Sequence, residues 1–238
     1  MPRAARRAVT AAVEYVIGRA GIAAVRALDR DVIGQGHHPR GVAGRVTGWV
    51  FAHRPSNRQR NGWVVSLLGV QPADQVLEIG FGPGLAVAEL VRAGAGHVYG
   101  IDHSDVMLHQ ASRRNAAAIR AGQVTLVNAP VDQLPAALDG PLDAILAVNS
   151  LGFWPAPAER LAELRRRLAP GGRIAIASQP RCPGATADTS RSAADKVENL
   201  LRSAGFTQMS TQTLPLSPPV ICVLAFRADA DADHAPQA

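Results

Sequence analysis

Short apolar runs alternate with helical stretches from Gln75 onward, and this alternation limits the fold more than any other feature of the sequence. The runs are typical of buried strands and occupy residues 75–79, 97–101, 123–128, 142–148 and 172–177. Helical stretches lie between them at 84–93, 104–120 and 157–168. Because strands that alternate with helices form right-handed βαβ units, the pattern predicts an α/β fold whose sheet is mostly parallel and covered by helices on both faces.

The pattern changes after a helix that we expect over 190–204. Two strand-like segments follow, "FTQMSTQTL" and "PVICVLAFR", and a proline-rich connection joins them. This connection is too short for a crossover helix, so the two strands should pair antiparallel.

The first part of the chain has only helical periodicity. Apolar residues recur at helical spacing over 8–29, and shorter helical stretches follow at 42–53 and 57–69. We expect residues 1–69 to form an N-terminal helical extension over a domain of residues 70–227, followed by a flexible tail at 228–238. The apolar stripe of the first helix needs burial on its own domain or on a dimer partner, which we prefer. Arginines flank the stripe, so a membrane-surface helix is the alternative.

Composition and charge restrict the class of protein. The chain has 238 residues, 47% of them hydrophobic, which suits one α/β domain with additions. Many of its 25 basic residues lie in the first quarter, where they could meet a nucleic acid, a lipid surface or an acidic substrate, or form a solvated helical face. The two cysteines lack CxxC spacing, and no apolar run reaches membrane-spanning length. We therefore expect a cytoplasmic protein, and the sequence leaves its oligomeric state open.

A glycine-rich loop marks the candidate site. "EIGFGPG", residues 78–84, ends the first strand of the series, at the edge where open parallel sheets bind ligands. Its three glycines allow close approach of a ligand, and the next helix offers free N–H groups. The spacing is neither the G-x-G-x-x-G of a dinucleotide site nor a P-loop.

Asp102 adds a carboxylate at the end of the second predicted strand. A carboxylate there can accept both ribose hydroxyls of a nucleoside that lies across the glycine loop. Alternatively, Asp102 or Ser104 could cap the helix that follows.

Five segments in register resemble the class I S-adenosylmethionine-dependent methyltransferases, and in particular their small-molecule "type 11" group. They are "VLEIGFGPG", "VYGIDHSDVML", "VTLVNAPVDQLP", "LDAILAVNSLGFW" and "LRRRLAPGGRIAI". The resemblance covers about residues 75–227. It implies a Rossmann-like seven-stranded sheet with an antiparallel C-terminal strand pair, S-adenosylmethionine as the cofactor, and methyl transfer as the reaction.

The resemblance also implies the residues that contact the cofactor. They are Glu78, Gly80, Phe81, Gly82, Gly84, Asp102, His103, Pro130, Val131, Asn149 and Ser150. The glycines would line the methionine end, Asp102 would hold the ribose, and His103 would lie near the adenine. Asn149 and Ser150 would face the methionine portion and the methyl group.

One position departs from the family pattern. Family members often carry an Asp where this chain has Pro130, and that Asp accepts a hydrogen bond from the adenine amino group. Adenine recognition would then fall to backbone groups around Val131, or to Asp132.

The chemistry needs few catalytic groups, because the methyl group on a sulfonium is already activated and mainly requires orientation and exclusion of water. Phe153 and Trp154 could face the sulfonium, although we favour a place over the core for Phe153. A hydroxyl acceptor would need a base, for which the candidates are His37, His38 and His53, each more often a surface or structural histidine. No HExxH or similar spacing occurs, so we expect no metal.

The methyl acceptor is the least constrained part of the prediction. Asn149-Ser150-Leu151-Gly152 lacks the [DN]-P-P-[YFW] pattern of DNA amino-methyltransferases, and aromatic residues make up only 4% of the chain, so we do not expect a nucleic acid as the acceptor. We prefer an O, N or C nucleophile of a small, fairly apolar molecule, bound under a lid rich in Val, Trp and Phe. The lid residues are Val46, Trp49, Val50, Phe51 and Trp63, which are equally consistent with a plain helical core. The alternatives are an RNA or protein methyltransferase and a cofactor-binding protein that does not methylate.

Overall fold

A computed structural model of the chain describes residues 55–135, 138, 140–180, 182 and 184–228. Its strands are β1 (Gln75–Ile79), β2 (His97–Asp102), β3 (Val124–Asn128), β4 (Leu142–Val148), β5 (Leu168–Ser178), β6 (Thr207–Leu214) and β7 (Val220–Phe226). Its helices are α4 (Pro55–Leu68), α5 (Leu85–Arg92), α6 (Asp105–Arg114), α7 (Ala116–Arg120), α8 (Pro157–Arg167), α9 (Ala187–Ser203) and the 3₁₀ turn η2 (Leu151–Phe153).

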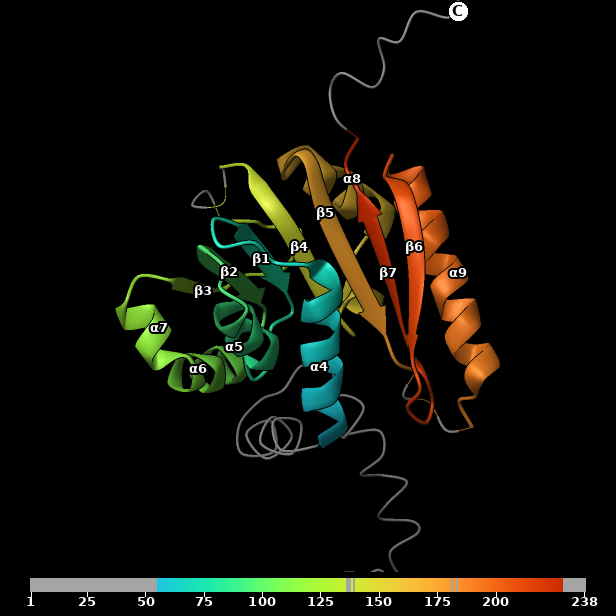
Figure 1. Ribbon diagram of the computed structural model, residues 1–238, viewed down its shortest axis with the longest axis horizontal. Coiled ribbons are helices and arrows are strands. Elements are labelled where there is room, and N and C mark those ends of the chain that lie inside the picture. Colours follow the sequence, from blue (N-terminus) through green and yellow to red (C-terminus); the bar gives the residue numbers. More distant parts are fainter. Residues whose placement is uncertain (1–54, 136–137, 139, 181, 183, 229–238) are drawn as a thin grey trace, which may run out of the picture.

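The seven strands form one sheet in the order β3-β2-β1-β4-β5-β7-β6 (Figure 1). β1 to β5 run parallel, β7 pairs antiparallel with β5, and β6 pairs antiparallel with β7. The predicted fold class is therefore confirmed. β1 lies between β2 and β4, so the chain reverses its winding direction beside β1, where such sheets bind ligands.

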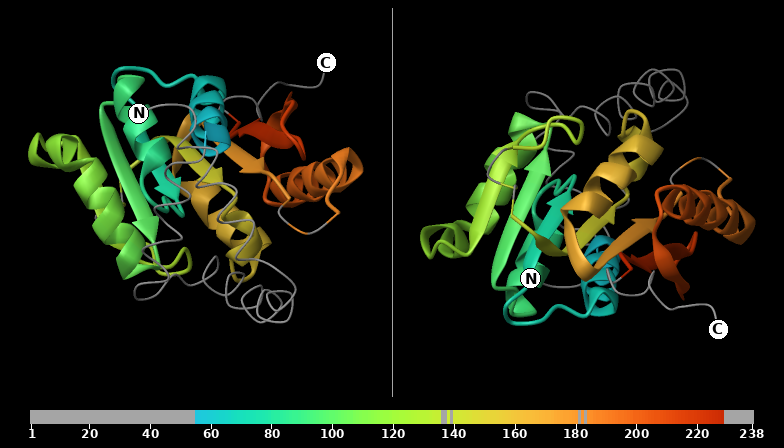
Figure 2. Two further views of the ribbon diagram at one scale, coloured as in Figure 1. Left: turned by 90° about the horizontal axis from the view of Figure 1, so that it is seen from below. Right: turned by 90° about the horizontal axis from the view of Figure 1, so that it is seen from above.

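Helices cover both faces of the sheet (Figure 2). On one face, α4, α5 and α6 pack over a core that includes Val65, Leu90 and Met107. On the other face, α8 and α9 pack over a core that includes Leu164 and Leu201. Within the described residues, no helix is long and apolar enough to span a membrane.

Two predicted elements differ most from the structure. The helix expected over 104–120 is two helices, because Asn115 leaves helical geometry at φ −104° and its side chain bonds to Gly84 O and Ala111 O. β5 begins at Leu168 rather than at Gly172, because Leu168 already pairs with Leu142 before a register shift.

Part of the predicted N-terminal extension is described. α4 packs its C-terminal half on the sheet, where Val64 and Leu68 are buried. Trp63 is partly buried against the same core, whereas the rest of the predicted lid lies outside the described residues. The predicted helices at 8–29 and 42–53, the histidines at 37, 38 and 53, and the tail beyond residue 228 also lie outside them.

Candidate functional site

The glycine loop joins β1 to α5 in a left-handed conformation. Gly80, Gly82 and Gly84 have φ of 78°, 50° and 76°. A Cβ on Gly80 would lie 2.5 Å from Ser150 Cβ, and one on Gly84 would lie 2.6 Å from Asn115 Nδ2. A Cβ on Gly82 would meet no atom of the described residues within 4 Å. At Gly80 and Gly84 the packing of the protein itself therefore leaves no room for a side chain, whereas Gly82 leaves space beside the loop for a ligand.

Asp102 ties this loop to the end of β2. Its Oδ2 accepts a hydrogen bond from the Gly82 N–H at 2.9 Å, and its Oδ1 accepts one from the Ser104 N–H at 2.9 Å. The cap of α6 is Ser104, whose Oγ accepts from the Met107 N–H, so the capping role falls to Ser104. A carboxylate offers about four lone-pair sites, so Asp102 can still accept ligand hydroxyls.

Two buried carboxyl groups make the electrostatics of this edge unusual. Burial raises the pKa of Asp102, against hydrogen bonds from the Ser104 and Gly82 N–H groups and the nearby His103. Burial, and next the charge of Asp102, raise the pKa of Glu78 well above its usual range, while a bond from the Val87 N–H opposes the shift. Within the described residues, Glu78 Oε2 has no hydrogen-bond partner. Such a pair favours a ligand that brings hydroxyl groups or positive charge.

The end of β4 lies against the same loop. Ser150 Oγ donates a hydrogen bond to Ile79 O at 2.6 Å, which fastens β4 to the end of β1. Asn149 has a φ of 56°, and its Oδ1 accepts from the Gln179 N–H at 2.7 Å. The structure thus brings Asn149 and Ser150 to the glycine loop, with both side chains in defined hydrogen bonds.

The other predicted cofactor positions lie around this centre. His103 is on the surface, with its Nδ1 3.9 Å from Asp102 Oδ1. Pro130 is exposed and Val131 is buried, in a turn that the Ala129 N–H fastens to Asp102 O at 3.0 Å. The Phe81 side chain is 3% exposed and packs in the core.

The expectation for Phe153, the first of the two aromatic residues after β4, is wrong. Phe153 does not cover the core but is 47% exposed, whereas Trp154 is buried. The reason is the 3₁₀ turn η2, in which residues three apart share one side. Leu151 and Trp154 both pack in the core, and Phe153 turns outward.

Sequence reasoning missed four residues that support the site. Arg114 Nε donates to Pro83 O at 2.9 Å, and Asn115 Nδ2 donates to Gly84 O at 3.2 Å, so both hold the loop from behind. Arg60 Nη1 donates to Gln179 Oε1 at 2.8 Å, and both side chains are buried. The available signals were a polar residue directly after a buried strand, for Gln179, and an Asn inside a helical stretch, for Asn115.

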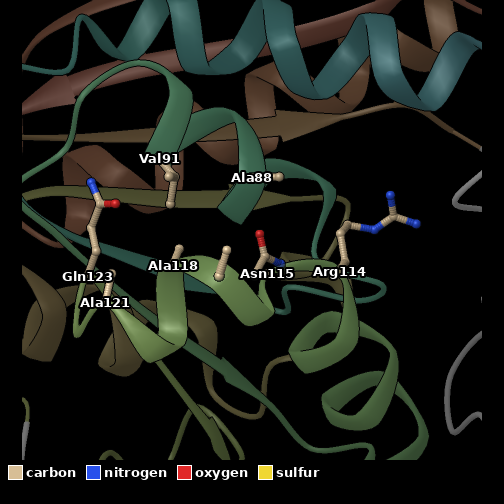
Figure 3. Close-up of a pocket in the computed structure, with 8 residues that line it drawn as sticks. Ala88, Val91, Arg114, Asn115, Ala118, Ala121 and Gln123 are labelled. Atoms are coloured by element: carbon tan, nitrogen blue, oxygen red, sulfur yellow. The ribbon is translucent and has the colours of Figure 1, made fainter.

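A groove of about 430 Å³ lies between α5 and α7, behind the loop (Figure 3). Arg114 and Gln123 line it together with Ala88, Ala118 and Ala121. Neither Asp102 nor Glu78 lines it, and half of its lining residues are alanine. The chemistry-bearing groups meet at the carboxyl edge of β1, β2 and β4, and this edge is therefore the candidate site.

Comparison with known proteins identifies relatives of this chain. Residues 76–172, which include the loop, Asp102 and Ser150, match a family model described as a methyltransferase domain. The chain is 28% identical over 182 residues to the uncharacterized methyltransferase YdaC of Bacillus subtilis, covering 76% of this chain and 97% of YdaC.

Two further matches are more distant. Cycloartenol-C-24-methyltransferase 1 of Oryza sativa is 26% identical over 133 residues, which is 53% of this chain but only 38% of that protein. The crystal structure of the N-methyltransferase NodS from Bradyrhizobium japonicum, in complex with S-adenosyl-L-homocysteine, superposes with a TM-score of 0.58 at 18% identity. The superposition covers 75% of this chain and 90% of NodS, and it shows a shared fold.

Proposed function

We propose that this chain, a member of the class I S-adenosylmethionine-dependent methyltransferases, transfers the methyl group of S-adenosylmethionine to an O, N or C nucleophile of a small, fairly apolar molecule. The observation that carries the proposal is the open space at Gly82 beside a carboxylate that already holds the Gly82 N–H. A nucleoside with two ribose hydroxyls fits this combination, because its sugar can approach bare backbone and still reach Asp102.

The charges of the site suit the same cofactor. S-adenosylmethionine supplies a methyl group that its positive sulfonium has already activated. The buried carboxyls of Glu78 and Asp102 favour a cation nearby, because its charge would stabilise their ionised forms. We assign the methionine end to the glycine loop, Asn149 and Ser150, and the ribose to Asp102.

The adenine would lie between His103 and the turn at Pro130 and Val131. Proline has no side-chain acceptor for the adenine amino group, so backbone carbonyls of that turn would take this role. Pro130 O already accepts from the Gln133 N–H at 3.1 Å, and it keeps a second lone pair.

An exposed aromatic side chain supports the apolar acceptor. Among the described residues, Phe153 is the large hydrophobic side chain that is exposed, and it lies three residues after Ser150. An apolar acceptor can cover this ring while its nucleophile approaches the methyl group, so that binding excludes water from the reacting atoms. α4 begins at the same edge, and we propose that residues 1–69 form the extension that completes the site above the domain of residues 70–227.

Calorimetric titration with S-adenosylmethionine tests the site. Asp102→Ala should weaken binding at least about tenfold, since hydrogen bonds to a charged group are each worth about 1.5–3 kcal/mol. Asp102→Asn should weaken it less, because one acceptor oxygen remains. Gly82→Val should abolish binding by filling the open space. Asp195→Ala, on the exposed side of α9, is the matched control.

Circular dichroism verifies that each variant is folded. If folded Asp102→Ala and Gly82→Val both bind like the parent, the site is elsewhere and the proposal fails.

Transfer of a labelled methyl group to a panel of small apolar alcohols, amines and acidic carbon compounds tests the acceptor class. Phe153→Ser should reduce this transfer while leaving cofactor affinity unchanged. Labelling of total RNA in preference to every member of the panel would replace the small-molecule proposal with an RNA acceptor.

A further inference from the structure

Gln179 is a buried side chain that is held at both ends. Its Oε1 accepts a hydrogen bond from Arg60 Nη1 at 2.8 Å, and its Nε2 donates to Pro218 O at 2.8 Å. Arg60 comes from α4 and Pro218 from the connection between β6 and β7, more than thirty residues away from Gln179 on either side. Gln179 and Arg60 are 5% and 6% exposed. The amide therefore fixes the chain directly after β5 to two other parts of the molecule.

The backbone of Gln179 in turn holds Asn149. The Gln179 N–H donates to Asn149 Oδ1 at 2.7 Å, and the Asn149 N–H donates to Ala177 O at 2.8 Å. Together these bonds keep Asn149 at a φ of 56°, in the left-handed region that asparagine adopts more readily than most residues but less readily than glycine. Such a conformation persists where the surroundings over-determine it, and such positions cluster at functional sites. Here the conformation of Asn149 is fixed by its hydrogen bonds to Ala177, in the neighbouring strand β5, and to Gln179, which directly follows that strand.

Asn149 is connected to the glycine loop through one more residue. Ser150 donates its hydroxyl to Ile79 O, and its Cβ lies where a Cβ on Gly80 would be 2.5 Å away. A change in the backbone at Asn149 therefore moves Ser150 against the first glycine of the loop. The contacts run without a gap from α4 to the end of β1.

We infer that Arg60 and Gln179 are positioning residues that shape the methionine end of the cofactor site, acting through Asn149. This inference rests on the proposed function, because Asn149 matters to the reaction only where the amino-acid portion of the cofactor lies beside it. Gln179 acts indirectly, by holding the Asn149 side chain through its backbone N–H. The same contacts make the geometry of the site depend on the position of α4.

Two ligands separate this role from a general structural one. S-adenosylhomocysteine carries the amino-acid portion of the cofactor, and 5′-methylthioadenosine has the same nucleoside and sulfur without it. Calorimetry on the full chain should show that Gln179→Leu weakens binding of S-adenosylhomocysteine about tenfold, which corresponds to about 1.4 kcal/mol. Binding of 5′-methylthioadenosine should change less than about twofold.

Further variants test the order of the contacts. Arg60→Met should reproduce the selective loss. The double variant should bind S-adenosylhomocysteine at least as tightly as the less tightly binding of the two single variants, because the effects of residues in one network are not additive. Gln179→Glu keeps an acceptor for Arg60 and should recover part of the affinity. Gln212→Leu, on the exposed strand β6, is the matched control and should bind both ligands like the parent.

Equal weakening of both ligands, or an unchanged affinity for S-adenosylhomocysteine, would overturn the inference. If Gln179→Leu does not fold, Arg60→Met carries the same test with the same two outcomes. A parent that binds both ligands equally would also overturn the inference, yet it would leave the nucleoside part of the proposed function in place. A parent that binds neither ligand would end the proposed function and this inference with it.

Discussion

At the amino edge of the sheet, the carboxylate of Asp74 is paired with the guanidinium of Arg173. Glu78, four residues later in the chain, is buried at the other edge, where no described residue pairs with it in this way. Arg173 also donates to Leu68 O and Gly69 O, and the Gln71 N–H donates to Asp74 Oδ2 at 2.8 Å. This network fastens α4 to the start of β1 and to β5. Buried charge at the amino edge is therefore compensated by the protein itself.

The carboxyl edge is arranged differently. Glu78 and Asp102 accept hydrogen bonds from backbone N–H groups, and burial raises the pKa of both. Buried carboxyl side chains thus stabilise the fold at the amino edge. At the carboxyl edge they remain able to accept a ligand's hydroxyl groups or to interact with its positive charge. Perturbed groups of this second kind are common at binding sites. The difference predicts that removing a charged partner at the amino edge costs stability, whereas a side chain added in the open space at Gly82, on the carboxyl edge, costs binding.

Arg173→Met should have the largest effect. Removing the cation leaves Asp74 buried and uncompensated, and losing one partner of a buried pair costs about 3–5 kcal/mol of unfolding free energy. Urea denaturation measures this loss. Arg191→Met is the control, because its pair with Asp188 is exposed and should contribute less than about 1 kcal/mol. An equal loss in the two variants would contradict a stabilising amino edge.

Gly84→Ala should come next. The new Cβ would lie 2.6 Å from Asn115 Nδ2 and 2.9 Å from Ala111 Cα, at a φ of 76°. Overpacking and a left-handed alanine together should cost about 2–4 kcal/mol. Gly94→Ala measures the cost of a left-handed alanine alone, because Gly94 has a φ of 91° and a Cβ there would meet no described atom within 4 Å. Urea midpoints that coincide for the two variants would show that the loop can relax away from α6.

Gly82→Ala should separate binding from stability. Its Cβ would enter open space at a φ of 50°, so the loss of stability should be about 1–2 kcal/mol, as in Gly94→Ala. Affinity for S-adenosylhomocysteine should nevertheless fall by at least about tenfold in Gly82→Ala alone, because the methyl group would occupy the ligand's space. Calorimetry on both variants checks this, and matched affinities would place the ligand away from Gly82.

The fold could be predicted because its signals are local. The apolar runs of β1 and β4 are bounded by polar or turn residues, and their predicted limits, 75–79 and 142–148, agree with the structure. Limits set by contacts between distant residues could not be predicted. β5 starts early because Leu168 pairs with Leu142, and the helix after β2 breaks because Asn115 bonds to Gly84.

In the candidate site, too, features with a local sequence signal could be predicted, and features that depend on contacts between distant residues could not. Asp102 and the glycine loop end neighbouring parallel strands, so the sequence could predict that they meet, although their roles toward the cofactor stay predictions. Arg60 and Gln179 are 119 residues apart, and such a contact leaves no periodic pattern in the sequence. The exposure of Phe153 depended on a single 3₁₀ turn, which apolar character alone does not reveal.

The smallest expected effect is a gain in stability from Glu78→Gln. In the unfolded chain the Glu78 carboxyl titrates near its ordinary value of about 4.3. In the folded chain burial and Asp102 raise its pKa well above that value. Between the two values the folded protein keeps a proton that the unfolded chain has lost, so stability falls as pH rises through this window.

Glutamine cannot ionise, and its amide oxygen can still accept from the Val87 N–H. Glu78→Gln should therefore match the parent near pH 4 and exceed it at pH 8, by about 2–4 °C in Tm for each kcal/mol. Glu159→Gln, on the exposed face of α8, should follow the parent at both pH values. Asp102 also titrates with a raised pKa, so part of the pH dependence should persist in Glu78→Gln. If thermal unfolding of Glu78→Gln and the parent differs by the same amount at pH 4 and pH 8, then Glu78 is not the carboxyl that makes the two edges of the sheet unequal.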